Sequence, residues 1–102
     1  MVGNYKVITL CGSTKFKDEF EIAQKVLTLK GYIVISVGCF GHSGDNLTDT
    51  QKIMLDDMHK RKIDICDEIF VINVNGYIGR STAADIEYAK EQGKEVVYLY
   101  NV

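Results

Sequence analysis

Four short apolar runs alternate with longer polar segments, and this alternation restricts the fold more than any other feature of the chain. The four runs are 7–11, 32–37, 68–73 and 95–100. Each is apolar at most positions, which is typical of strands buried on both faces of a parallel sheet. The order β-α-β-α-β-α-β therefore predicts an α/β fold with helices on both sides of the sheet.

The three segments between these runs have the features of helices. In 15–30, apolar residues recur every three or four positions, at Phe16, Phe20, Ala23 and Leu27, with Ile22, Val26 and Leu29 widening the stripe. A second helix is predicted to begin near Thr48 or Asp49 and to turn four apolar residues inward: Ile53, Leu55, Met58 and Ile65. A third is predicted over 81–92 and is closed by Gly93.

Right-handed crossovers between parallel strands favour the strand order 2-1-3-4. We therefore predict a flavodoxin- or Rossmann-like three-layer sandwich with a four-stranded parallel sheet, formed by one domain over residues 1–102. Ligands of such sheets bind beyond the carboxyl ends of the strands, where neighbouring crossovers diverge. Here that point lies between the strands 7–11 and 68–73, so the loops 12–15 and 73–82 should be neighbours in space.

Charge and cysteine content narrow the classes of partner and compartment. The net charge of -2 argues against binding to a nucleic-acid polymer, which normally needs a basic excess. The cysteines, at 11, 39 and 66, form no C-x-x-C pair, and we expect reduced thiols in a cytoplasmic protein. No signal peptide or membrane-spanning run is apparent, so no membrane association is expected. His42 and His59 are too far apart in sequence to predict a metal site, and no cofactor is expected.

The first motif that could carry chemistry is Cys11-Gly12-Ser13-Thr14-Lys15, directly after the first strand. Gly12 allows a sharp turn and a close approach of backbone to a ligand. The hydroxyls of Ser13 and Thr14 and the amides of the next helix can bind an oxyanion, with Lys15 adding charge. A tight turn with an ordinary Ser or Thr N-cap explains these residues equally well, and the P-loop pattern is absent.

The second motif is the loop and helix start after the third strand, where Asn73 and Gly79 are candidates for contacts with a substrate. Ser81 and Thr82 can cap the helix, and its N-terminus can hold an anion. Asp85 shares one helical face with both hydroxyls. Thr82-x-x-Asp85 also resembles a capping box, so a purely structural role for Asp85 stays open.

Other charged groups have simpler interpretations. Glu87 lies about 200° around the helix from Asp85 and is predicted to be solvated. The acidic pair Asp56-Asp57 is followed by the basic run 60–62, which predicts a solvated, charge-paired helix face.

The opening loop, Leu10-Cys11-Gly12-Ser13 with a basic residue soon after, and the later half, 67–97, resemble the nucleoside 2-deoxyribosyltransferase-like superfamily. That superfamily includes the deoxynucleoside 5'-monophosphate N-glycosidases. Within it, the segment 72–89, with Gly76-Tyr77-Ile78-Gly79, is similar to a group of short, mostly uncharacterised relatives. The likeness covers nearly the whole chain.

The resemblance implies a protein that cleaves or exchanges the base–sugar bond of a nucleoside or nucleoside 5'-monophosphate through a carboxylate nucleophile. The spacing to Gly93-Lys94 matches Asp85 to that nucleophile, where the family usually has Glu. Ser13 and Lys15 match the phosphate loop, and Ser81 matches the hydroxyl beside the nucleophile.

The position of the family's second catalytic carboxylate is held here by His59, eight residues before Asp67. A histidine can donate a proton, and Asp56 or Asp57 is an alternative donor.

Two further functions stay open beside this enzyme. The same pocket could serve a non-catalytic nucleotide-binding sensor or scaffold, or it could be vestigial in an assembly protein. Both the enzyme and the sensor or scaffold would bind a small nucleoside or nucleotide. We also expect a homo-oligomer, since relatives form dimers or larger assemblies, with Met54, Met58 and Tyr77 as contact residues.

Overall fold

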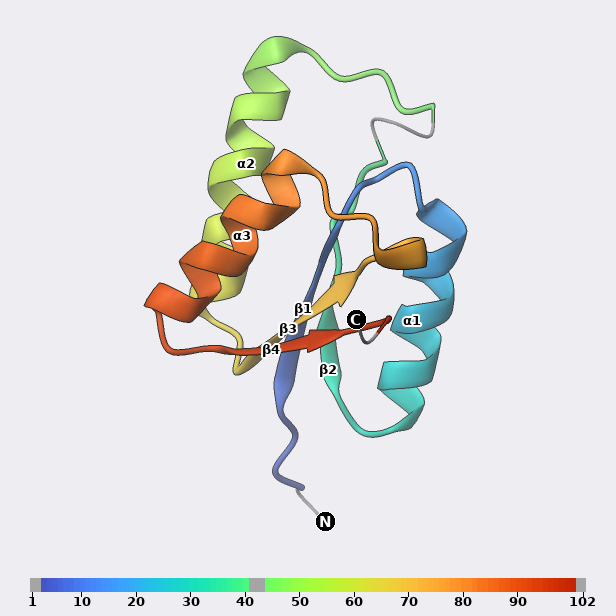
Figure 1. Cartoon of the computed structure of the whole chain (residues 1–102), viewed down its shortest axis with the longest axis vertical. Helices are drawn as coiled ribbons and strands as arrows, with labels where there is room; N and C mark the ends of the chain where they lie inside the picture. The colour runs from blue at the N-terminus through green and yellow to red at the C-terminus, as the bar shows by residue number, and fades with distance from the viewer. Residues whose placement is uncertain (1–2, 41–43, 101–102) are drawn as a thin grey trace.

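The computed structural model describes residues 3–40 and 44–100, and it is built on one four-stranded sheet (Figure 1). The strands are β1 (Val7–Gly12), β2 (Ile33–Ile35), β3 (Glu68–Ile72) and β4 (Glu95–Tyr98). The helices are α1 (Lys17–Leu29), α2 (Asp49–Asp64) and α3 (Arg80–Glu91), with a short 3₁₀ turn, η2 (Val74–Gly76). All neighbouring strands are parallel and their order is β2-β1-β3-β4, which confirms the prediction.

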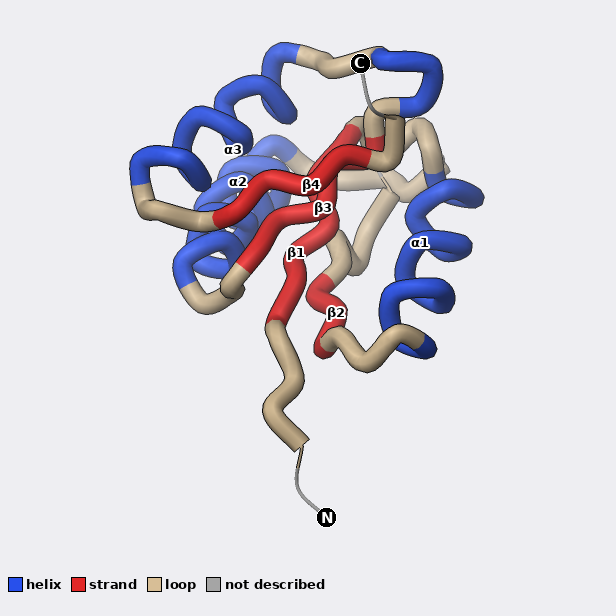
Figure 2. The backbone as a smooth tube through the Cα atoms, turned by 60° about the horizontal axis from the view of Figure 1, so that its bottom comes forward, coloured by secondary structure: helices blue, strands red, loops and turns tan. Residues whose placement is uncertain are grey.

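The sheet lies between α1 on one face and α2 with α3 on the other, so the three-layer arrangement is also confirmed (Figure 2). Each face has its own core. The side chains buried on the α1 side are Ile8, Leu10, Phe20, Ala23, Leu27 and Ile72. Those buried on the α2–α3 side are Cys11, Ile63, Cys66, Ile69, Val71, Ile86 and Ala89. Adjacent residues of β1 thus point to opposite faces, as the two-residue period of a strand requires.

The register between β1 and β3 brings the two predicted loops together. Gly12 is the last residue of β1 and pairs with Ile72, the last residue of β3. The strands approach so closely here that a Cβ on Gly12 would lie 3.0 Å from the carbonyl oxygen of Ile72. The segments that follow β1 and β3 therefore start side by side, as predicted for the loops 12–15 and 73–82.

The start of α2 follows from a capping box. The Thr48 hydroxyl accepts a hydrogen bond from the Gln51 amide at 3.1 Å, and the Gln51 side chain accepts one from the Thr48 amide at 2.9 Å. This reciprocal pair satisfies two amides that the helix leaves without partners. The predicted start near Thr48 or Asp49 is confirmed.

The predicted inward face of α2 is wrong. Ile53, Met58 and Ile65 are exposed, by 72%, 41% and 69%, Leu55 is half-buried, and Ile63 is the buried residue of the helix. The first half of α2, which carries Ile53, rises past the carboxyl end of β3, so Ile53 has no sheet to pack against (Figure 1).

The wider stripe predicted for the first helix is also wrong. Phe20, Ala23 and Leu27 are buried as predicted, whereas Ile22, Val26 and Leu29 are exposed. The exposed residues are rotated by roughly 60–180° from the buried stripe, and among the described helices α1 alone covers its face of the sheet, so its outer side has no neighbouring helix (Figure 2). None of the helices in the described part of the chain combines the length and the apolar character needed to cross a membrane.

Candidate functional site

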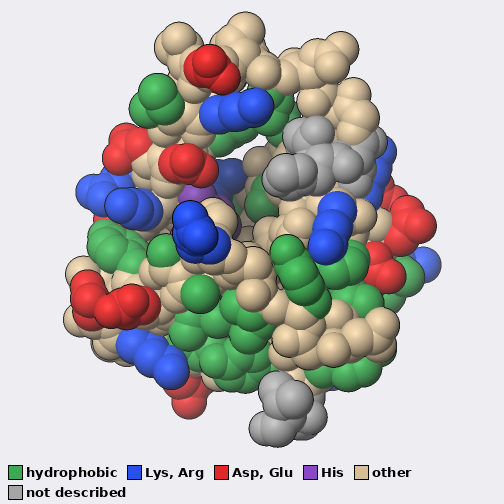
Figure 3. All heavy atoms as spheres, turned by 45° about the horizontal axis from the view of Figure 1, so that its top comes forward, with side chains coloured by type: hydrophobic (Ala, Val, Ile, Leu, Met, Phe, Trp, Pro, Cys, Tyr) green, Lys and Arg blue, Asp and Glu red, His purple; other side chains and the backbone are tan. Residues whose placement is uncertain are grey.

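A pocket of about 850 Å³ opens at the carboxyl ends of β1 and β3, where the fold predicts a ligand site. The end of β1 and the turn after it line the pocket with residues 12–14, and the start of α3 with its N-cap lines it with residues 79–82, 84 and 85. Residues from α2 and from the loop before it, together with Tyr77, form the remaining wall. Figure 3 shows a hollow on this side of the molecule, with acidic and basic side chains around it. The volume lies within the range of about 300–1,000 Å³ usual for small-molecule sites.

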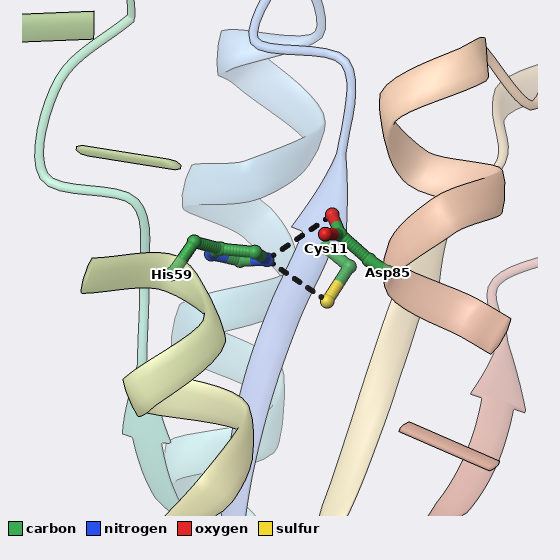
Figure 4. A group of neighbouring side chains, drawn as sticks. All are labelled: Cys11, His59 and Asp85. Atoms are coloured by element: carbon green, nitrogen blue, oxygen red, sulfur yellow. Dashed lines mark hydrogen bonds and ion pairs between the residues drawn. The ribbon is translucent and has the colours of Figure 1, made fainter. Parts of the chain in front are cut away.

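Three side chains from three different elements meet in this region: Cys11 of β1, His59 of α2 and Asp85 of α3 (Figure 4). The His59 Nε2 atom lies 3.3 Å from the Asp85 Oδ2 atom and 3.3 Å from the Cys11 Sγ atom. The side chains of His59 and Asp85 are 16% and 18% exposed, while Cys11 is fully buried. An attractive contact with the carboxylate requires a proton on Nε2, because two acceptors would repel each other.

The burial of Cys11 sets its protonation state. It lies on the face of β1 that packs against α2 and α3. Burial, followed by the negative charge of Asp85 and the neighbouring Cys66, raises the pKa of the Cys11 thiol well above its ordinary value. The thiol is therefore neutral at physiological pH in the structure as it stands.

The beginning of α3 differs from the predicted capping arrangement. The helix begins at Arg80 with Gly79 as its N-cap, so Ser81 and Thr82 lie inside the first turn and no side chain caps it. The capping-box interpretation of Asp85 is wrong for the same reason, since the box would need Thr82 as the N-cap. The first turn lines the pocket with the positive end of the helix dipole.

The loop after β1 is a compact turn. The Ser13 hydroxyl accepts a hydrogen bond from the Lys15 amide at 3.4 Å, and the Ser13 carbonyl accepts one from the Phe16 amide at 3.1 Å. Helix α1 then starts without a side-chain cap. Gly12, Ser13 and Thr14 line the pocket as predicted.

Two predicted binding residues do not line the pocket. Lys15 lies over the ring of Tyr77, with its Nζ atom 3.7 Å from the ring centroid, and so sits beside a lining residue. Asn73 is fully buried, and its side chain donates to the Tyr100 carbonyl and accepts from the Tyr100 amide, both at 2.9 Å. The nitrogen and the oxygen of its side-chain amide hold the chain after β4, which is a structural role.

Several charged lining residues were not among the predicted binding residues, although Asp56 was considered as an alternative proton donor. The cations are Lys52, Lys60, Lys62 and Arg80, and the carboxylates besides Asp85 are Asp45 and Asp56. The interpretation of the α2 charges as a purely solvated face is therefore wrong for part of that face. The spacing of Lys52, Asp56 and His59 by four and three residues carries the missed signal, because it places them on one side of a helix.

Lys62 is the most enclosed of these cations. Its Nζ atom donates to the Ser36 carbonyl at 2.8 Å, and burial lowers its pKa. Glu87 is exposed, as predicted, and lies outside the pocket lining. His42 lies outside the described residues.

The sequence was compared with models of known protein families, and none matched. None of the curated proteins matched the chain either.

Proposed function

We propose that the protein binds a nucleoside 5'-monophosphate in this pocket and cleaves its base–sugar bond, with Asp85 as nucleophile and His59 as proton donor. The observation that carries the proposal is the His59–Asp85 pair, in contact at 3.3 Å, in a pocket formed by both predicted loops. A carboxylate beside a proton donor is the arrangement that retaining glycosidases use.

The charge around the pocket suits a phosphate. Among the described residues, four cationic side chains line it against three carboxylates, although the whole chain has a net charge of -2. The uncapped first turn of α3 and the glycine turn after β1 add backbone donors. These features favour a monophosphate over an uncharged nucleoside.

The proposed reaction has two steps. An Asp85 oxygen attacks the anomeric carbon, the bond from that carbon to the base nitrogen breaks, and the base takes its electron pair and a proton from His59. A water molecule then attacks the same carbon, gives a proton back to His59, and releases the Asp85 carboxylate. The products are a free base and a sugar phosphate.

A second candidate is non-catalytic nucleotide binding, and the closeness of the pair favours it. Retaining glycosidases separate the two groups by about 5–5.5 Å so that the anomeric carbon fits between them. The contact of 3.3 Å in this structure means that a substrate must part His59 from Asp85 before reaction. A protein that only binds nucleotides needs no such separation.

The deciding experiment incubates the protein with a panel of nucleosides and 5'-monophosphates and follows the free base by chromatography, with thermal stabilisation measured in parallel. Base release that Asp85→Asn abolishes and Glu87→Gln leaves intact would support the enzyme. Stabilisation without base release would support the binding protein. Release that persists in Asp85→Asn would remove Asp85 from the mechanism.

We also propose that copies of the chain associate through α2. The helix and its C-cap residue expose large apolar side chains, chiefly Ile53, Met54, Met58 and Ile65. Burial of such side chains between copies is favourable by about 25 cal/mol for each Å² removed from water.

A further inference from the structure

We propose that Cys11, His59 and Asp85 form a binding site for one zinc ion. The three side chains contribute a sulfur, a ring nitrogen and a carboxylate oxygen, and these atoms all lie within 4.8 Å of one another (Figure 4). The inference does not require the proposed glycosidase activity.

The spacing of the three atoms suits a tetrahedral ion. Ligands held about 2.0–2.3 Å from zinc lie roughly 3.3–3.7 Å from one another. The Nε2 atom of His59 is 3.3 Å from both the Cys11 sulfur and an Asp85 oxygen. Small movements of side chains are enough to place a metal among them.

The chemistry of the donors selects the ion. Binding of the ion would release the proton of the Cys11 thiol and leave the His59 proton on Nδ1, so that the sulfur and Nε2 are free to coordinate. A thiolate with an imidazole is a soft-to-borderline set that suits zinc, whereas magnesium and calcium prefer all-oxygen sites. The other two cysteines are not members of this cluster. The sequence spacing predicted no metal site because the three residues come from β1, α2 and α3, far apart along the chain.

The site would leave one coordination position open. His59 and Asp85 line the pocket, while Cys11 lies buried behind them. Three protein ligands with a fourth position facing a pocket is the arrangement of catalytic zinc sites, whereas structural zinc has four protein ligands. A zinc ion here would occupy the Asp85 oxygen and the His59 nitrogen that the proposed reaction uses, so zinc should inhibit base release.

The test uses reduced, tag-free, metal-depleted protein titrated with cobalt(II), which reports thiolate coordination by an intense near-ultraviolet charge-transfer band and tetrahedral geometry by visible bands. We expect one equivalent of cobalt to bind with both signatures and zinc to displace it. Absence of either signature at saturating cobalt would overturn the proposal.

Variants assign the ligands. His59→Gln and Asp85→Asn should each weaken cobalt binding by more than about a hundredfold, since even partners outside the ligand shell contribute about 10–100-fold. Cys11→Ser should lose the charge-transfer band, and Cys39→Ser should keep it. If Cys11→Ser fails to fold, His59→Gln serves as the test of the site. Unchanged cobalt affinity in His59→Gln would contradict the site.

The titration is independent of the proposed function, because it uses no nucleotide. Zinc binding with no base release from any nucleotide would support the metal site and contradict the enzyme. Base release that saturating zinc does not inhibit would contradict the metal site and leave the enzyme standing.

Discussion

The Nε2 atom of His59 and the Oδ2 atom of Asp85 lie 3.3 Å apart, although the residues belong to α2 and α3 and are 26 positions apart in the chain. Both helices cover the same face of the sheet, and His59 and Asp85 are among the several residues that they present to the pocket at the end of β1 (Figures 1 and 4). A ligand bound in this pocket beside one of the two residues also lies close to the other. A change at either residue should therefore affect the other.

Lengthening the nucleophile tests the proposed reaction. Asp85 is shorter than Glu by one methylene, and a misplacement of about 1 Å can cost roughly a hundredfold in rate. We expect Asp85→Glu to lower kcat/KM for base release by roughly ten- to a hundredfold, measured by chromatography of the free base, because the longer side chain displaces the carboxylate and crowds His59, which already lies 3.3 Å away. Glu87→Asp, on the exposed side of α3, should leave the rate unchanged. An Asp85→Glu enzyme as fast as wild type would contradict the proposed role of Asp85 as the nucleophile.

The apolar surface of α2 predicts an oligomer. Met54 and Met58 are 51% and 41% exposed, so replacing both with lysine should convert an oligomer to a monomer in light scattering. Ile22→Lys, at an α1 residue that is 63% exposed, is the matched control and should not change the mass. A monomeric wild-type protein at high concentration would rule out this surface as a self-association site.

The close approach of β1 and β3 predicts a cost at Gly12. A Cβ there would lie 3.0 Å from the Ile72 carbonyl oxygen and 3.1 Å from the Ile72 Cβ atom, and neither can move without displacing the sheet. We expect Gly12→Ala to lower the free energy of unfolding by about 1–3 kcal/mol, measured in urea.

Gly79→Ala is the control for this prediction. A Cβ at Gly79 meets the tip of the Tyr77 side chain at 3.3 Å, and that side chain can shift. The loss in Gly79→Ala should therefore be smaller than the loss in Gly12→Ala. Equal losses would mean that the contact with Ile72 is not the cause.

The role of Asn73 can be separated from binding. Its side chain makes two hydrogen bonds to the Tyr100 backbone. Asn73→Ala should lower the free energy of unfolding by about 1–3 kcal/mol, because the partner groups lose their bonds in a part-buried place. Gln24→Ala, at an exposed amide of α1, should change it little. Nucleotide affinity, measured by calorimetry, should be unchanged in Asn73→Ala, and a large loss would show that Asn73 contacts the ligand.

The hydrogen bond between Tyr88 and Asp64 predicts a dependence on alkaline pH. The Tyr88 hydroxyl donates to the Asp64 carboxylate at 2.5 Å, and this bond, aided by desolvation, raises the pKa of Tyr88 above 10.0. The folded state therefore favours the neutral phenol. The stability that this hydrogen bond contributes is fully present below the pKa of Tyr88 in the unfolded chain. It is lost as the pH rises through the higher pKa of Tyr88 in the folded protein.

Tyr88→Phe should accordingly be less stable than wild type at neutral pH, and the difference should shrink above the ordinary tyrosine pKa of about 10. Urea unfolding of both proteins, at neutral pH and above a pH of about 10, measures this difference in stability. Tyr5→Phe, at an exposed tyrosine, should match wild type at both. A Tyr88→Phe difference that does not change with pH would contradict the role of the phenol proton.

The local pattern of the chain was enough to predict the elements. Apolar runs such as 68–73 and the helical spacing of Phe20, Ala23 and Leu27 are properties of neighbouring residues, so the strands, the helices and the strand order followed from them. The two loops at the crossover point were predicted to meet for the same reason, because parallel topology brings the carboxyl ends of adjacent strands together.

Tertiary structure decided which side chains meet and which stay in solvent. The burial of an α2 residue depends on how far the helix extends past the sheet, so periodicity placed Ile53 and Met58 inside when they are exposed. The contact of Cys11 with His59 and Asp85 depends on packing between β1, α2 and α3, and no spacing along the chain encodes it. Asn73 was likewise predicted to contact a substrate, but in the folded chain its side-chain amide is hydrogen-bonded to the backbone of Tyr100. Sequence patterns report short-range geometry, whereas these contacts arise only when distant segments pack together.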